Sequence, residues 1–91
     1  MSWSLVFTEQ YEKRAVRFLK RHPEFEKQYL KTLQLLEVNP FHPSLRLHAL
    51  SGRLSGLHSV SINLSSRITL EFLLNDQEII PVNVGDHDTL Y

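Results

Sequence analysis

The chain has 91 residues, which is enough for one small domain with a single hydrophobic core. Its hydrophobic share of 42% is ordinary for a folded globular protein, and ten basic residues balance ten acidic ones, so no overall field draws the chain to nucleic acid. The absence of cysteine excludes disulfides and thiolate metal sites and fits a reducing compartment. We expect one cytoplasmic domain over residues 1–91, without a membrane span or a signal peptide.

The first half of the chain carries the pattern of a strand followed by two helices. Apolar and polar residues alternate over 2–8, which predicts a strand. Thr8 is suited to cap a helix, and apolar residues then recur at helical spacing up to Arg21. Pro23 stops this helix and suits the first turn of a second one, which ends before Asn39-Pro40. The pattern therefore predicts a strand and a helical hairpin.

The second half carries the period-two pattern of strands. After a short extended piece over 45–49 and a loop over 51–56, three alternating stretches predict strands at 58–64, 67–74 and 79–84. The fold class is therefore α+β, with an antiparallel meander and two helices on one face of a single sheet.

The same alternation divides the residues of the sheet between two faces. We expect the helices to cover the apolar side chains Val60, Ile62, Ile68, Leu70, Phe72, Leu74, Ile80, Val82 and Val84. The opposite, polar face should carry Ser59, Ser61, Arg67, Thr69, Glu71 and Asn83. Pro81 has no amide donor, so it should lie on an edge or at an unpaired position of the ladder.

The last ten residues carry the densest polar chemistry of the chain. We expect Gly85 to end the final strand, because glycine adopts backbone angles closed to other residues. A short tail then follows with Asp86, His87, Asp88 and Tyr91. A titratable imidazole between two carboxylates, with a phenol four residues on, indicates a functional site.

Three features taken together resemble one protein family. They are the loop His48-Ala49-Leu50-Ser51-Gly52-Arg53-Leu54-Ser55-Gly56-Leu57, the arginine Arg67 that opens the next-to-last strand, and the ending Val84-Gly85-Asp86-His87-Asp88-Thr89-Leu90-Tyr91. With the order of the elements, they resemble the RelE/ParE superfamily of bacterial toxins, most closely its YafQ-like branch. The resemblance implies a ribosome-dependent endoribonuclease that cuts mRNA and that a cognate antitoxin neutralises.

The resemblance also implies a reaction that uses no metal and no cofactor. The ribose 2′-OH attacks its own 3′-phosphate, so the site must accept a proton, donate one and stabilise negative charge. By position, His87 and His48 are the acid–base candidates, Arg67 would hold the phosphate, and Tyr91 would stack on a base or donate a proton. The residues expected to contact RNA are Arg53, His58 and Asp86.

The chain departs from the family pattern at several positions. His58 stands where the family usually has an arginine, Ser59 and Ser61 stand where many active members have a basic residue or histidine, and Ser65-Ser66 replaces an acidic-aromatic pair. With so few cations, two alternatives remain open: a toxin of the ParE type that inhibits gyrase without chemistry, and a decayed toxin that only binds its antitoxin. The basic first helix would present a solvated face, or meet ribosomal RNA or an acidic antitoxin segment.

Overall fold

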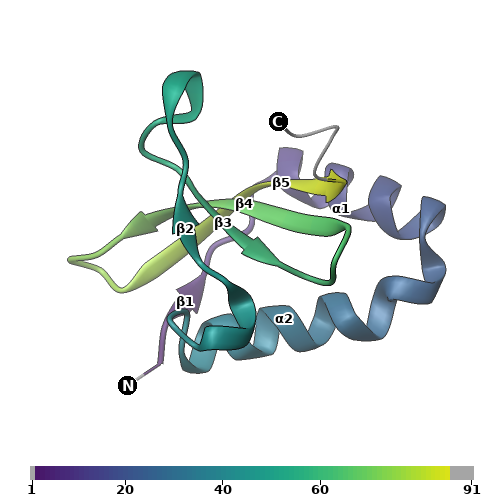
Figure 1. The fold of residues 1–91 in the computed structure, drawn as a ribbon, viewed down its shortest axis with the longest axis horizontal. Helices are drawn as coiled ribbons and strands as arrows, with labels where there is room; N and C mark the ends of the chain where they lie inside the picture. The colour runs from purple at the N-terminus through teal and green to yellow at the C-terminus, as the bar shows by residue number, and fades with distance from the viewer. Residues whose placement is uncertain (1, 87–91) are drawn as a thin grey trace.

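The computed structural model describes residues 2–86, which form two helices and a five-stranded mixed sheet (Figure 1). The elements in chain order are β1 (Ser4–Leu5), α1 (Glu9–Arg21), the 3₁₀ turn η1 (Pro23–Phe25), α2 (Glu26–Val38), the 3₁₀ turn η2 (Pro43–Leu45), β2 (His48–Ala49), the 3₁₀ turn η3 (Gly52–Leu54), β3 (His58–Ser61), β4 (Ser66–Leu73) and β5 (Glu78–Asp86). The strand order is β1-β5-β4-β3-β2, in which β1 pairs parallel with β5 and all other pairs are antiparallel. The predicted α+β fold class is confirmed.

Local signals explain where the helices begin and end. The Oγ1 atom of Thr8 accepts a hydrogen bond of 3.1 Å from the backbone N–H of Tyr11 and so caps α1. Acidic residues in the first turn of α1 and basic residues in its last turn favour the helix dipole. Pro23 does not begin α2 directly; it opens η1, and α2 follows from Glu26. The helical hairpin is therefore as predicted, with one short turn added.

The register of the strands determines which side chains lie on each face of the sheet. Val60, Ile68 and Val84 lie opposite one another across β3, β4 and β5 and are almost fully buried against the helices. Their neighbours Ser61 and Arg67 form the next row, on the polar face. The hydrophobic core consists of Tyr11, Ala15, Phe18, Tyr29, Leu36, Leu45, Val60, Ile68, Leu70, Ile79 and Val84.

A bulge in β5 overturns part of the predicted core. The register shifts between Thr69 and Leu70, so Leu70 lies opposite Pro81 rather than Val82. One extra residue reverses the alternation in the earlier part of the strand. Ile79 is therefore fully buried, while Ile80 lies opposite Glu71 on the other face. The expectation that Ile80 and Val82 face the helices was wrong.

Two further expectations at strand ends need correction. Leu74 lies in the turn after β4 and is 67% exposed, so it is not a core residue. Gly85 does not end the last strand, because β5 continues to Asp86 and Gly85 pairs with Arg67. No positive φ occurs at Gly85, unlike at Gly52 and Gly56 in the β2–β3 loop.

Within residues 2–86, strand β5 has an edge beyond β1 that no other strand covers. The last bond between the two is from the N–H of Val6 to the carbonyl of Ile79, at 2.9 Å. Pro81 follows Ile79 by two residues, so its nitrogen points to this same side, where no donor is needed. Of the two expected positions, Pro81 therefore occupies an edge: it pairs with Leu70 of β4 on one side and has no strand on the other within residues 2–86. Helix α1 lies alongside this part of β5 (Figure 1).

A pair of tyrosines joins the two helices inside the core. The hydroxyls of Tyr11 in α1 and Tyr29 in α2 are 2.8 Å apart and hydrogen-bonded, and both residues are almost fully buried. Burial raises the pKa of both phenols above the ordinary tyrosine value. Separately, no helix within residues 2–86 is long and apolar enough to cross a membrane.

Candidate functional site

Arg67 stands at the start of β4 on the polar face, as the sequence pattern predicts. Its Nη1 donates a hydrogen bond of 2.7 Å to the Oγ of Ser61, the residue directly opposite on β3. Its Nε is buried and has no hydrogen-bond partner among residues 2–86. The guanidinium is thus held in place by one nitrogen while another donor is unpaired, which is an arrangement suited to binding an anion.

A hollow of about 270 Å³ lies beside Arg67, at the edge of β3 that β2 leaves uncovered. Ser61, Asn63 and Gln28 line it, and Arg46 joins Arg67 as a second cation. Arg46 follows η2 in the left-handed conformation, with φ 52° and ψ 44°. Sequence reasoning missed this residue, because nothing in the pattern predicts that turn. Arg46 therefore adds a second positive charge beside Arg67, where the sequence pattern had placed one.

His48 and Arg53 lie together in the segment that follows. His48 pairs with Ser59 across β2 and β3, two residues along β3 from the pair formed by Ser61 and Arg67 and on the same polar face. Its Nδ1 lies 3.1 Å from the carbonyl oxygen of Arg46. His48 and Arg53 line a second hollow of about 500 Å³, formed by residues 48–54. In Figure 1 the β2–β3 loop rises away from the sheet. Both side chains are exposed, so they are accessible to a ligand.

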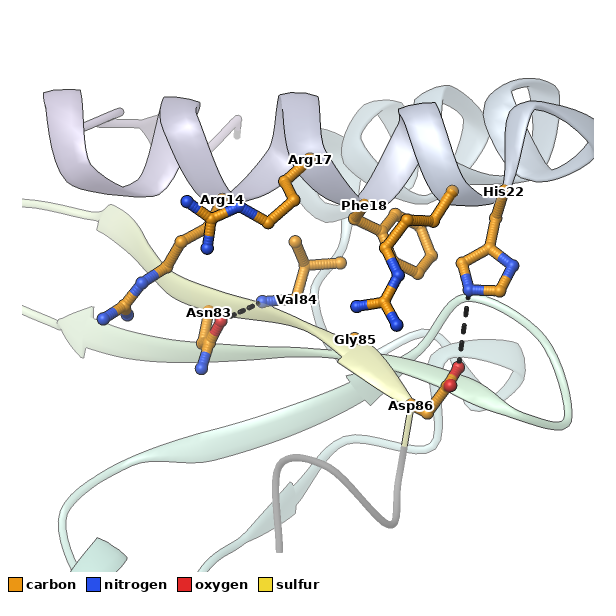
Figure 2. A pocket seen from close by; sticks show the side chains of 9 residues that line it. Arg14, Arg17, Phe18, His22, Asn83, Val84, Gly85 and Asp86 are labelled. Carbon is orange, nitrogen blue, oxygen red and sulfur yellow. Dashed lines mark hydrogen bonds and ion pairs between the residues drawn. The ribbon is translucent and has the colours of Figure 1, made fainter.

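His58 and Asp86 are not brought together with Arg67. His58 lies opposite Leu70 on the helix side of the sheet, and its ring meets Phe72 edge-on at 5.0 Å between centroids. Asp86 ends β5, and its carboxylate points toward α1, with Oδ1 4.0 Å from Nε2 of His22 (Figure 2). The other two predicted site residues, His87 and Tyr91, lie outside the residues that the structure describes.

A third hollow, the α1–β5 pocket, lies between helix α1 and the uncovered edge of β5. It has a volume of about 290 Å³. Its lining residues are Arg14, Arg17, Phe18, Arg21, His22, Asn83, Val84, Gly85 and Asp86. Figure 2 shows the Arg14 side chain extending from α1 toward β5, with Arg17 beside it along the helix. Sequence reasoning found these arginines on a basic helix but not the strand that they face.

Potential metal ligands do not gather in the same way. Among residues 2–86, no group of three or more histidine, aspartate or glutamate side chains is placed to hold a metal ion. The main polar side chains at the polar face and in the α1–β5 pocket are therefore arginines, hydroxyl groups and single histidines. Such groups bind oxyanions through hydrogen bonds and charge.

The fold is similar to that of several solved structures of bacterial toxins. The chain is similar to the crystal structure of YafQ from E. coli, with 20% identity, 98% of both chains covered and a TM-score of 0.70. It is also similar to the structure of a YoeB/ParE toxin from Agrobacterium tumefaciens, with 15% identity, 92% of this chain and 98% of that chain covered and a TM-score of 0.74. The chain is also similar to the toxin in the E. coli DinJ-YafQ toxin-antitoxin complex, with 22% identity, coverage of 100% and 99% and a TM-score of 0.68.

Sequence comparison adds no closer relative. No family model matches the chain, and no curated protein sequence matches it either. At 15–22% identity, the structural likeness establishes the fold and its extent over nearly the whole chain. The activity must be argued from the site itself.

Proposed function

We propose that this protein is the toxin of a toxin–antitoxin pair and acts as a ribosome-dependent mRNA endoribonuclease. The observation that carries the proposal is the anchoring of Arg67 by Ser61 on the polar face, with Arg46 lining the same hollow. Two guanidinium groups at one hollow suit a phosphodiester, whose charge grows during cleavage. The likeness to toxin structures over nearly the whole chain supports the same reading.

The reaction proposed is transesterification within the RNA. A ribose 2′-OH loses its proton and attacks the adjacent phosphorus; the bond to the 5′ oxygen breaks, and that oxygen takes a proton. The products are a 2′,3′-cyclic phosphate and a 5′-OH. Arg67 and Arg46 bind the phosphate oxygens, His87 and His48 are proposed for the two proton transfers, and Tyr91 for stacking on a base or giving a proton. Arg53, beside His48, would bind the RNA backbone.

The ribosome has a specific part in this proposal. A chain with ten basic and ten acidic residues gains little from counterion release, so free RNA should be a poor substrate. The ribosome would deliver mRNA in position and add positive charge or orientation that the site lacks. The cognate antitoxin would cover the polar face or the helical hairpin at nanomolar affinity or better, with apolar anchors supplying most of the binding energy.

Pulse labelling of protein and DNA synthesis after induction tests the proposal. Methionine incorporation should fall first, while thymidine incorporation continues at the start. Arg67→Gln should abolish the effect, whereas Lys13→Gln, which removes the same charge from an exposed ion pair with Glu9, should keep it. An early fall in DNA synthesis with translation intact would point instead to a gyrase inhibitor of the ParE type and overturn the proposal.

A further inference from the structure

The α1–β5 pocket concentrates positive charge at a place that the proposed reaction does not use. Arg14, Arg17 and Arg21 are spaced by three and four residues, so they lie on one face of α1 and all reach the pocket. The one carboxylate among the lining residues is that of Asp86. The pocket therefore carries a net positive charge although the whole chain is neutral.

The backbone of β5 at this pocket is already bonded and offers little to an added strand. Arg14 donates from Nη1 to the carbonyl of Val82 at 2.9 Å, and the N–H of Val84 donates to Oδ1 of Asn83 at 2.9 Å. A peptide that paired with this edge would have to break both bonds. An occupant should therefore bind to the side chains of α1 and not to the strand.

Two of the three guanidinium groups are available for such an occupant. Within residues 2–86, Arg17 and Arg21 have no hydrogen-bond or ion-pair partner, and both are exposed. Phe18 and Val84 form the buried floor beneath them. Free guanidinium groups above an apolar floor bind carboxylates and phosphates well, because the planar fork donates two parallel bonds.

The position of Gly85 favours RNA over an acidic peptide. Gly85 lines the pocket and is also the residue opposite Arg67 on β4. As a glycine, it places no side chain of its own between the polar face and the pocket. We propose that the α1–β5 pocket is a second phosphate-binding site, at which Arg17 and Arg21 hold the backbone of the same RNA strand away from the scissile phosphate. This extends the proposed function and rests on it only for the identity of the RNA.

Binding without cleavage tests the site. The probe is a short single-stranded RNA with 2′-O-methyl riboses, in which the 2′ oxygen cannot attack the phosphate. Binding is measured by nuclear magnetic resonance through the side-chain Nε–H signals of Arg17 and Arg21. Both signals should shift, and Arg17→Gln with Arg21→Gln should weaken binding about tenfold or more and lower the salt slope by about 1.4, as for two lost contacts to a single strand. The matched control, Lys13→Gln with Lys20→Gln, removes two charges of the same helix outside the pocket and should change affinity less than about twofold.

Other outcomes would overturn the inference. Equal losses in the two double variants would mean a diffuse field of the helix and no site. Arginine signals that stay unmoved by RNA would overturn the RNA site. Signals that respond more strongly to an oligo-glutamate peptide would make the pocket a site for an acidic protein segment. If the arginine variant fails to fold, the shifts in the parent protein still decide. A failure of pulse labelling alone would overturn the nuclease and leave this site standing.

Discussion

The tyrosine pair in the core and Arg67 on the polar face differ in how their buried polar atoms are bonded. On the helix side, the hydroxyls of Tyr11 and Tyr29 bond to each other inside the core. On the polar face, Arg67 makes one bond to Ser61 and leaves its Nε without a partner among residues 2–86. An unpaired buried donor costs stability, while a paired one adds to it. Unpaired buried atoms are not confined to the polar face, because Nδ1 of His58 and Oγ of Ser66 also lack a partner among residues 2–86. Arg67 differs from them in carrying a fixed positive charge, so the tyrosine pair is suited to stability and Arg67 to an anionic ligand that completes its bonds.

Arg67→Gln should separate activity from stability most strongly. Loss of the guanidinium removes the main contact to the developing charge, so cleavage on programmed ribosomes should fall about 100- to 1,000-fold. Thermal unfolding should change little, because the lost bond to Ser61 is offset by removal of an unpaired buried donor. A large fall in melting temperature together with retained cleavage would reverse the comparison.

His87→Ala should act in the same direction. If His87 transfers a proton, its loss should slow cleavage by about 100-fold or more, and the pH dependence of the rate should change with it. We expect truncation of this polar side chain to cost little stability. A variant as active as the parent would return His87 to a structural role, such as capping a C-terminal turn.

Arg46→Gln should have a smaller effect of the same kind. Arg46 lines the hollow beside Arg67 but is exposed, so solvent screens its charge. We expect a fall in cleavage of about tenfold, with the free energy of unfolding unchanged within about 0.5 kcal/mol. Arg53→Gln, in the neighbouring hollow, is the comparison that shows whether the effect belongs to the Arg67 hollow or to any exposed arginine.

The helix side should respond in the opposite way. Tyr29→Phe leaves the buried hydroxyl of Tyr11 without its partner and should cost about 1–3 kcal/mol of unfolding free energy, with cleavage at permissive temperature unchanged. The double variant with Tyr11→Phe should cost less than the sum of the two single changes, since no orphaned hydroxyl remains. Chemical denaturation measures all three.

The tyrosine pair also predicts an alkaline limit to stability. Burial raises the pKa of both phenols, so the folded state holds their protons more tightly than the unfolded state does. Their contribution is therefore complete below the ordinary tyrosine pKa of about 10 and is lost as the pH rises above it. The double phenylalanine variant should lose less stability across this alkaline range. An equal loss in parent and variant would mean that other groups set the limit.

Much of the fold follows from local pattern, and the exceptions have physical causes. Capping by Thr8 and the alternation over β3 and β4 predicted the helices and the sorting of the two faces correctly. The bulge escaped prediction because Ile79, Ile80 and Val82 are all apolar and Pro81 lies among them, so no alternation marks the extra residue. Gly85 continued the strand because a glycine is equally compatible with extended backbone.

The site was only partly predictable for a related reason. The position of Arg67 on the polar face follows from period two, and the structure agrees. The approach of Arg46 depends on a left-handed turn after η2, and the α1–β5 pocket depends on how a helix packs beside a strand far along the chain. Neither contact has a local pattern, because both are set by tertiary packing.

The central claim is that the polar face around Arg67 cleaves mRNA through the RNA's own 2′-OH. The most direct measurement is an analysis of the RNA ends after the purified chain acts on ribosomes programmed with a defined message. The account predicts new fragments with 2′,3′-cyclic phosphate and 5′-OH ends, which Arg67→Gln removes and Lys13→Gln retains. Intact message, or fragments with 5′-phosphate ends that persist in the Arg67→Gln variant, would contradict it.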